Sequence, residues 1–287
     1  MAGFTNYLEQ KIADHWFGAT TYTPPATVYV GLYTTLPDDS GVGGAEPVGS
    51  GYARVSVTNN STNWRNASHG GTTGSRKYNA TTITFPAATA AWGVIAGYGI
   101  FDAASGGNLL AFNAISPTLD VASGSIVKFD PDAIAISIDI GGGAFTDHFQ
   151  NKIIDWLFGG GTGTPPANWF IGLLTVAADA VGNHTEVANA NNYSRITHAN
   201  SAANFSPATF DSGTNKWAKT GVAAVNPSFP APSGAWGNVV GWGLWDSGTT
   251  SGSGNLCLTG THYTVAPVGG DTVSWDGDNG TTYFYID

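Results

Sequence analysis

The sequence predicts a mainly β protein made of two tandem, homologous β-sandwich domains of jelly-roll-like type, each beginning with an amphipathic helix. Three observations support this prediction. The chain repeats itself at domain length, an apolar face with helical spacing opens each repeat, and the remainder alternates short apolar stretches with glycine- and proline-rich turns. With 287 residues, each copy is long enough to bury a core of its own.

The repeat has an offset of 141 residues, the separation of Phe4 from Phe145. Three pairs of segments share this offset: 4–14 with 145–155, 23–26 with 164–167, and 31–34 with 172–175. The repeat therefore divides the chain into domains at 1–140 and 141–287. The run Gly141-Gly142-Gly143 lies at the junction and predicts a short, flexible hinge.

A helix of about four turns is predicted at the start of each copy, because large apolar residues recur there at every fourth position. These residues are Phe4, Leu8, Ile12 and Trp16 in copy one, and Phe145, Phe149, Ile153 and Leu157 in copy two. Thr5, Asn6 or Asp147 can cap the helix start, and Gly18 and Gly159 end the helices. The apolar face either packs on the β-domain of its own copy or docks on another subunit.

The remaining predicted elements are strands and loops. Gly31 and Gly172 fall at the same point of two apolar strands, 27–34 and 168–175, and indicate a bulge or a close backbone approach. Further strands are predicted at 52–57, 193–197, 91–102, 235–246, 134–139 and 282–287. The polar segments 59–80 and 198–221 are predicted to be long loops or irregular hairpins that form the variable surface.

Charge and cysteine content exclude several classes of protein. The formal net charge is −10, and acidic residues outnumber basic ones by ten to six in residues 1–140 and by ten to four in residues 141–287. No basic run exists to neutralise phosphates, so we expect no nucleic-acid partner. Cys257 is the single cysteine, which excludes an intrachain disulfide, and we expect it to be a small buried apolar residue. We recognise neither a signal peptide nor an apolar run that could cross a membrane.

A set of motifs in copy one is distinctive when taken together. It comprises Trp16-Phe17-Gly18 and the segments 22–34, 51–55, 83–88 and 92–102, and copy two matches it more loosely. The set resembles a family of tailed-bacteriophage virion proteins that are labelled as head-decoration or tail-fibre proteins. The resemblance implies a non-enzymatic structural component of a phage virion. Because we recognise no signal peptide, we expect assembly in the host cytoplasm.

The sequence predicts no catalytic residues and no cofactor. None of the six histidines recurs at an equivalent position, and no zinc-protease, nucleophile-elbow or phosphate-loop motif is found. Asp102 and Asp246 do recur, and we expect each carboxylate to accept backbone N–H groups in the turn that follows it. The segment Asp276–Gly280 predicts a β-turn between strands, with a Ca²⁺ site as the alternative, since it resembles the start of a calcium loop without the distal glutamate.

Four residues are candidates for contacts with partners. Arg54 and Arg195 each follow a tyrosine by two residues, and they either hold ion pairs and carbonyl groups within the fold or mark an interface. Trp64 and Trp217 lie in the variable segments, where exposed aromatic rings would stack on sugars.

Two functions follow from the sequence, and a third is disfavoured. The chain decorates or cements the capsid surface through the major capsid protein, other virion proteins, or copies of itself as homo-oligomer or lattice neighbours, with two domains that reinforce each other's binding. Alternatively, it is a tail-fibre or receptor-binding module that recognises host surface glycans. The first is favoured because the chain has no long repetitive shaft. A glycan-degrading enzyme would need two carboxylates facing one cleft, and the sequence offers no such pair.

Overall fold

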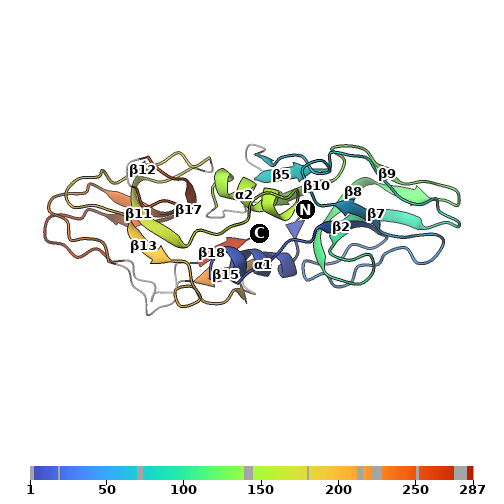
Figure 1. The fold of residues 1–287 in the computed structure, drawn as a ribbon, viewed down its shortest axis with the longest axis horizontal. Helices are drawn as coiled ribbons and strands as arrows, with labels where there is room; N and C mark the ends of the chain where they lie inside the picture. The colour runs from blue at the N-terminus through green and yellow to red at the C-terminus, as the bar shows by residue number, and fades with distance from the viewer. Residues whose placement is uncertain are drawn as a thin grey trace.

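A computed structural model of the chain describes residues 3–18, 20–69, 74–138, 145–179, 181–211, 216–220, 228–249, 252–274 and 283–286. Across these residues the protein is mainly β, with two helices and several antiparallel sheets, which confirms the predicted fold class. Figure 1 shows an elongated molecule with a lobe of strands at each end and both helices between the lobes. We call residues 3–138 the first half, residues 145–286 the second half, and the region of the helices the waist.

The first half contains a five-stranded sheet and a three-stranded sheet, both antiparallel. The larger sheet has the order β1 (Gly3–Phe4), β8 (Leu109–Val121), β7 (Gly93–Phe101), β2 (Thr27–Tyr33) and β3 (Val55–Thr58). The smaller has the order β10 (Ala135–Ile138), β5 (Ser75–Tyr78) and β4 (Ser68–His69), and β6 (Ile83–Thr84) pairs separately with β9 (Lys128–Phe129). The Tyr98 hydroxyl of β7 joins the two layers, because it exchanges hydrogen bonds of 2.9 Å with both backbone groups of Ala135.

The second half repeats this arrangement. Its larger sheet has the order β12 (Thr185–Glu186), β11 (Asn168–Val176), β16 (Val239–Trp245) and β17 (Leu256–Val265), with β13 (Ile196–Ala199) also paired to β11. Its smaller sheet has the order β14 (Thr209–Asp211), β15 (Lys216–Thr220) and β18 (Tyr283–Ile286). The register of the two larger sheets is also equivalent, because Gly31 pairs with Gly99 and Gly172 pairs with Gly243 across neighbouring strands.

The two helices, α1 (Asn6–Trp16) and α2 (Asp147–Leu157), begin differently from the prediction. Their N-cap residues are Thr5 and Thr146, and neither side chain caps its helix. Each threonine hydroxyl donates instead to a backbone carbonyl of its own sheet, at 2.6 Å from Leu109 and 2.5 Å from Leu256. Capping by Asp147 is therefore wrong, because that residue already belongs to the helix.

The predicted helix ends are confirmed. Gly18 and Gly159 follow the C-cap residues with φ of 118° and 129°, values at which a side chain would be strained.

Each helix crosses to the opposite half. α1 packs against β15 and β18 of the second half, and α2 packs against β4, β5 and β10 of the first half, while both keep contacts with their own larger sheets. The interpretation that each helix packs on its own β-domain is therefore incomplete, because each helix also packs on the other half of the chain. The partner of the apolar face is the other half of the same chain, a solution that the sequence analysis did not consider.

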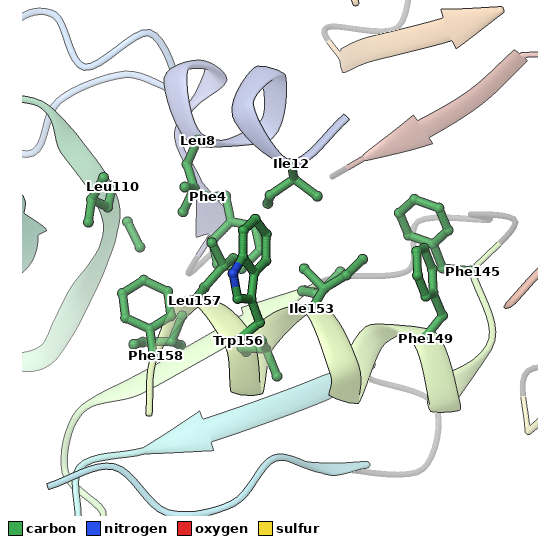
Figure 2. Packing of buried hydrophobic residues seen from close by; sticks show 14 of the residues in the cluster. Phe4, Leu8, Ile12, Leu110, Phe145, Phe149, Ile153, Trp156, Leu157 and Phe158 are labelled. Carbon is green, nitrogen blue, oxygen red and sulfur yellow. The ribbon is translucent and has the colours of Figure 1, made fainter. Parts of the chain in front are cut away.

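One hydrophobic core runs through the waist and into both lobes. Figure 2 shows Leu8 and Ile12 of α1 directed toward Ile153 and Trp156 of α2. All four side chains are 6% exposed or less. The two predicted domains thus share a continuous interior rather than having two separate ones.

The described residues of the polar segments 59–80 and 198–221 pair as the antiparallel hairpins β4–β5 and β14–β15, one of the two structures predicted for them. Among these strands, β4 and β5 contact α2 of the other half, and β15 contacts α1 of the other half. Trp64 and Phe205, which occupy equivalent positions in the two segments, are 0% and 4% exposed.

Candidate interaction sites

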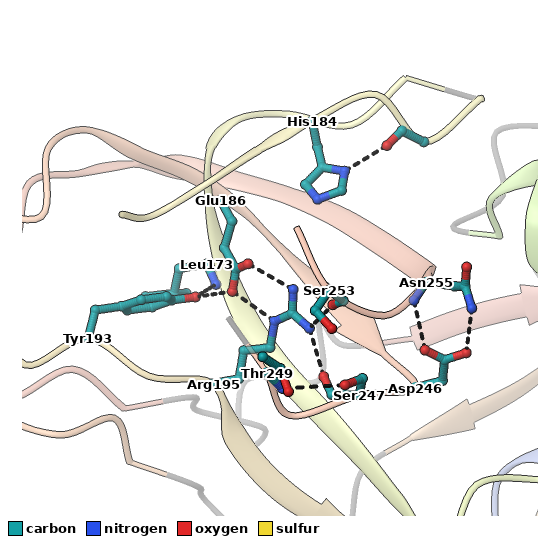
Figure 3. A network of polar contacts seen from close by, with 11 residues as sticks. Leu173, His184, Glu186, Tyr193, Arg195, Asp246, Ser247, Thr249, Ser253 and Asn255 are labelled. Carbon is teal, nitrogen blue, oxygen red and sulfur yellow. Dashed lines mark hydrogen bonds and ion pairs between the residues drawn. The ribbon is translucent and has the colours of Figure 1, made fainter. Parts of the chain in front are cut away.

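Arg195 lies at the centre of a polar network in the second half (Figure 3). Its guanidinium binds the Glu186 carboxylate through two hydrogen bonds of 2.9 and 2.8 Å, and it donates to the carbonyls of Ser247 at 2.7 Å and Ser253 at 3.0 Å. The same group lies 4.1 Å from the ring centre of Trp245. The network therefore ties β12 and the turn after β16 to the segment that leads into β13.

Arg54 makes the equivalent contacts in the first half. It binds both oxygens of Glu46 and donates to the carbonyls of Ala103 and Gly106, at 2.9 and 2.8 Å, above the ring of Phe101. The Arg54 side chain is 8% exposed and that of Arg195 1% exposed. Both arginines thus hold an ion pair and carbonyl groups within the fold, as one of the two predictions states. Little of either guanidinium group is left exposed for a partner.

Each network includes a tyrosine, half-buried Tyr52 or buried Tyr193, and a glycine that packs against it. The hydroxyl of Tyr193 donates to Glu186 at 2.9 Å and accepts the N–H of Leu173 at 2.8 Å. Burial, reinforced by the charge of Glu186, raises the pKa of Tyr193 above its usual range. A Cβ on Gly172 would lie 2.9 Å from a Glu186 oxygen, so the recurring glycine marks a close approach to the network, as one of the two sequence interpretations predicts.

The recurring carboxylates Asp102 and Asp246 close the neighbouring turns. Asp102 accepts the backbone N–H and the side-chain amide of Asn108, both at 2.6 Å, and Asp246 accepts the same two groups of Asn255 at 2.7 and 2.9 Å. The predicted role of both carboxylates as acceptors within a turn is confirmed.

The two candidate tryptophans lie in the polar segments 59–80 and 198–221. Trp64 is fully buried, with its ring centre 5.8 Å from that of Phe158 in the other half, so its indole cannot reach a sugar in this fold. Trp217 belongs to β15, where its backbone pairs with Phe210 and Ile286, and its side chain lies outside the described residues. The exposure that glycan stacking would require is therefore absent at Trp64 and stays a prediction at Trp217.

Exposed apolar side chains are found on both lobes. In the first half these are Val42, Val48, Val94, Leu119 and Ile126, and in the second half Val176, Val181, Phe210 and Val268. Val48 is the most exposed of them, at 92%. Singly exposed apolar residues of this kind are common on protein surfaces and do not by themselves define a binding site.

Metal and membrane sites can be assessed over the described part of the chain. No three His, Cys, Asp or Glu side chains gather there as metal ligands would. Asp276–Gly280 lies outside the described residues, so the Ca²⁺ alternative stays a prediction. None of the described helices has the length and hydropathy to cross a membrane. Cys257 is 1% exposed, which confirms the buried apolar role, and burial raises the pKa of its thiol.

The fold is a duplicated, mainly β scaffold, and the arginine and aspartate clusters described above bind groups of their own half. A comparison with protein families matches residues 3–137 and 144–275 to the family described as "Podophage GP4 fiber I protein gp80". The match covers most of the chain in two consecutive copies, and the chain therefore belongs to this family of phage virion structural proteins. The resemblance found in the sequence and the tandem duplication are both confirmed. Curated proteins give no match.

Sequence reasoning missed two pairs of residues that the structure makes important. Glu46 and Glu186 bind the arginines, and their offset of 140 departs by one from that of the repeat, which hid them. Asn59 and Asn200 hold the waist together and do recur at an offset of 141, so alignment of the two copies at every polar position would have found them.

Proposed function

We propose that this chain is a structural subunit of a podophage fibre, in which it acts as a rigid two-lobed connector between neighbouring virion proteins. The family match across both halves carries this proposal. The description of that family favours a fibre. The sequence alone had favoured the capsid surface. The chain has no long repetitive shaft, but this does not argue against a fibre, because a fibre can be assembled from several different subunits.

The shape of the molecule suits a connector. Its lobes project in opposite directions from the waist, where the N-terminal strand and both helices lie (Figure 1). Because one core passes through the waist, the lobes are fixed to each other rather than joined by a hinge. Exposed apolar residues on each lobe, such as Val48 and Val268, supply contacts that neighbours would cover.

Glycan recognition is not part of the proposal. A sugar-binding site needs accessible aromatic faces with polar groups around them. The aromatic candidate whose side chain is described, Trp64, is buried in the waist. Both recurring arginines form ion pairs with glutamates of their own half.

Electron microscopy of the phage particle tests the location. Antibody fragments raised against the purified full chain and coupled to gold should label the fibres that extend from the particle. Antibody absorbed beforehand with the purified chain serves as the control and should give no label. Gold distributed over the icosahedral capsid would overturn the proposal and favour the capsid-decoration function.

A further inference from the structure

The waist contacts are made twice, with the roles of the two halves exchanged. Asn200 of the second half accepts the N–H of Gly18 at 2.9 Å and donates to the carbonyl of Trp16 at 3.0 Å, at the end of α1. Asn59 of the first half accepts the N–H of Gly159 at 2.7 Å and donates to the carbonyl of Leu157 at 2.8 Å, at the end of α2. Each asparagine thus satisfies helix-end groups that belong to the other half.

The aromatic rings show the same exchange. Phe17 enters the second half, where its ring centre lies 6.4 Å from Phe145 and 5.8 Å from Phe205. Phe158 enters the first half, where it lies 6.4 Å from Phe4 and 5.8 Å from Trp64. Both phenylalanines are 1% exposed or less, so each half fills a pocket of the other with an equivalent side chain.

The helix carboxylates complete the pattern. Asp14 accepts the backbone N–H of Ala208 at 2.9 Å, and Asp155 accepts that of Ala67 at 2.7 Å. Asp155 also pairs with Lys77 of the first half, whose side chain is 2% exposed. The Lys77 side chain is thus paired by a carboxylate of the other half, and it lies next to Gly159 of that half.

We propose that the chain is an intramolecular dimer, in which the waist interface alone holds the two halves together without the covalent connection between them. Reciprocal contacts of equivalent residues are the defining property of an interface between two identical subunits. The surface that each half presents at the waist is therefore complementary to another half of the same kind. Such an interface includes a shared core, and subunits of obligate dimers often have no stable folded monomer.

Cleavage of the folded chain tests the proposal. Gly141–Gly143 is replaced by the recognition sequence of a specific protease, and the purified full-length protein is cut between its halves under native conditions. We expect the fragments to elute together from a size-exclusion column at micromolar concentration and to give the mass of the 29.6 kDa whole in native mass spectrometry. Separation of the fragments, whether folded or unfolded, would overturn the proposal.

Substitution of an asparagine that bonds to the other half tests whether the waist holds the fragments together. In the cleaved protein, Asn200→Ala should raise the dissociation constant of the fragments by roughly 10-fold or more, since it removes buried hydrogen bonds to the other half. Asn108→Ala is the matched control, because that side chain holds Asp102 of its own half, and it should leave the dissociation constant unchanged. Equal effects of the two substitutions would contradict the proposed interface. Near-UV circular dichroism of the uncut variants establishes that each one folds.

Discussion

At the scale of single residues, the polar networks tolerate the fewest changes of side chain, and Gly172 is the clearest example. Gly172 has no room for a side chain, because an added Cβ would lie 2.7 Å from the Trp245 ring and 2.9 Å from the Tyr193 hydroxyl. These neighbours are fixed by the ion pair of Arg195 and cannot move away independently. The glycine is therefore required by close packing and not by a special backbone angle.

We expect Gly172→Ala to destabilise the protein by about 1–3 kcal/mol, because one extra methyl group overpacks a buried site. The free energy of unfolding from urea titration measures the effect. Gly3→Ala is the control, since a Cβ at that position meets nothing within 4 Å and should change stability by less than about 0.5 kcal/mol. Similar values for the two substitutions would show that the network tolerates the methyl group.

His15 joins the two halves at the waist through its two ring nitrogens. Its Nδ1 accepts the N–H of Tyr22 at 3.1 Å, so Nε2 carries the proton and donates to the carbonyl of Gly163 in the other half at 2.6 Å. The imidazole also stacks on Trp156, with ring centres 4.2 Å apart. Burial lowers the pKa of His15, as it does those of His148 and His198, because the charged form loses its hydration.

Stability should therefore fall as the pH drops below about 6.5, the ordinary pKa of histidine. Above that pH the imidazoles are neutral in both states, whereas below it the unfolded chain binds protons that the folded chain resists. The loss is at most about 1.4 kcal/mol per pH unit for each histidine and ends at the folded-state pKa. Urea unfolding at pH 7.5, 6.5 and 5.5 measures it. His15→Gln, which cannot titrate, should flatten the dependence, and an unchanged slope would contradict this role.

At the scale of elements, the helices matter because each one belongs structurally to the other half. α2 meets the first half through Gln150, which accepts the N–H of Ser75 at 3.0 Å, and through Asp155, which pairs with Lys77. Burial lowers the pKa of Lys77, and its pairing with Asp155 opposes that shift. The ion pair thus makes a buried lysine acceptable between a helix and a sheet.

Removing the two partners of this pair should have unequal effects. Asp155→Ala leaves the Lys77 ammonium buried without a counter-charge and should cost about 3–5 kcal/mol. Lys77→Met keeps the apolar volume and leaves the half-exposed carboxylate with the N–H of Ala67, so it should cost less than about 1.5 kcal/mol. Thermal unfolding of both variants provides the comparison. The reverse order of stabilities would show that burial of the lysine is not the dominant cost.

At the scale of the whole molecule, the shared core predicts cooperative unfolding. Gly31→Ala and Gly172→Ala perturb equivalent sites in opposite lobes. If the halves depend on each other through the waist, both substitutions should lower the midpoint of one common transition in differential scanning calorimetry. Two transitions, with each substitution shifting only one of them, would indicate independent domains.

Local patterns accounted for much of the fold. Apolar residues at every fourth position predicted both helices, and Gly18 and Gly159 predicted where they end. Asp102 and Asp246 predicted turns in which a carboxylate accepts a backbone N–H. Such features depend on neighbours close in sequence. The roles of Trp64 and Asn59 depend instead on Phe158 and Leu157, about a hundred residues away, and no spacing within one copy reveals them.

The sequence by itself determined that the chain is duplicated, mainly β and acidic, with an amphipathic helix in front of each copy. Only the tertiary structure decided where those helices pack. An apolar helix face specifies that it must be buried, but the hydrophobic effect has no direction, so the same face satisfies either its own domain or the other one. The choice was made by complementary shape and hydrogen bonds at the waist, which joins the two copies into one molecule.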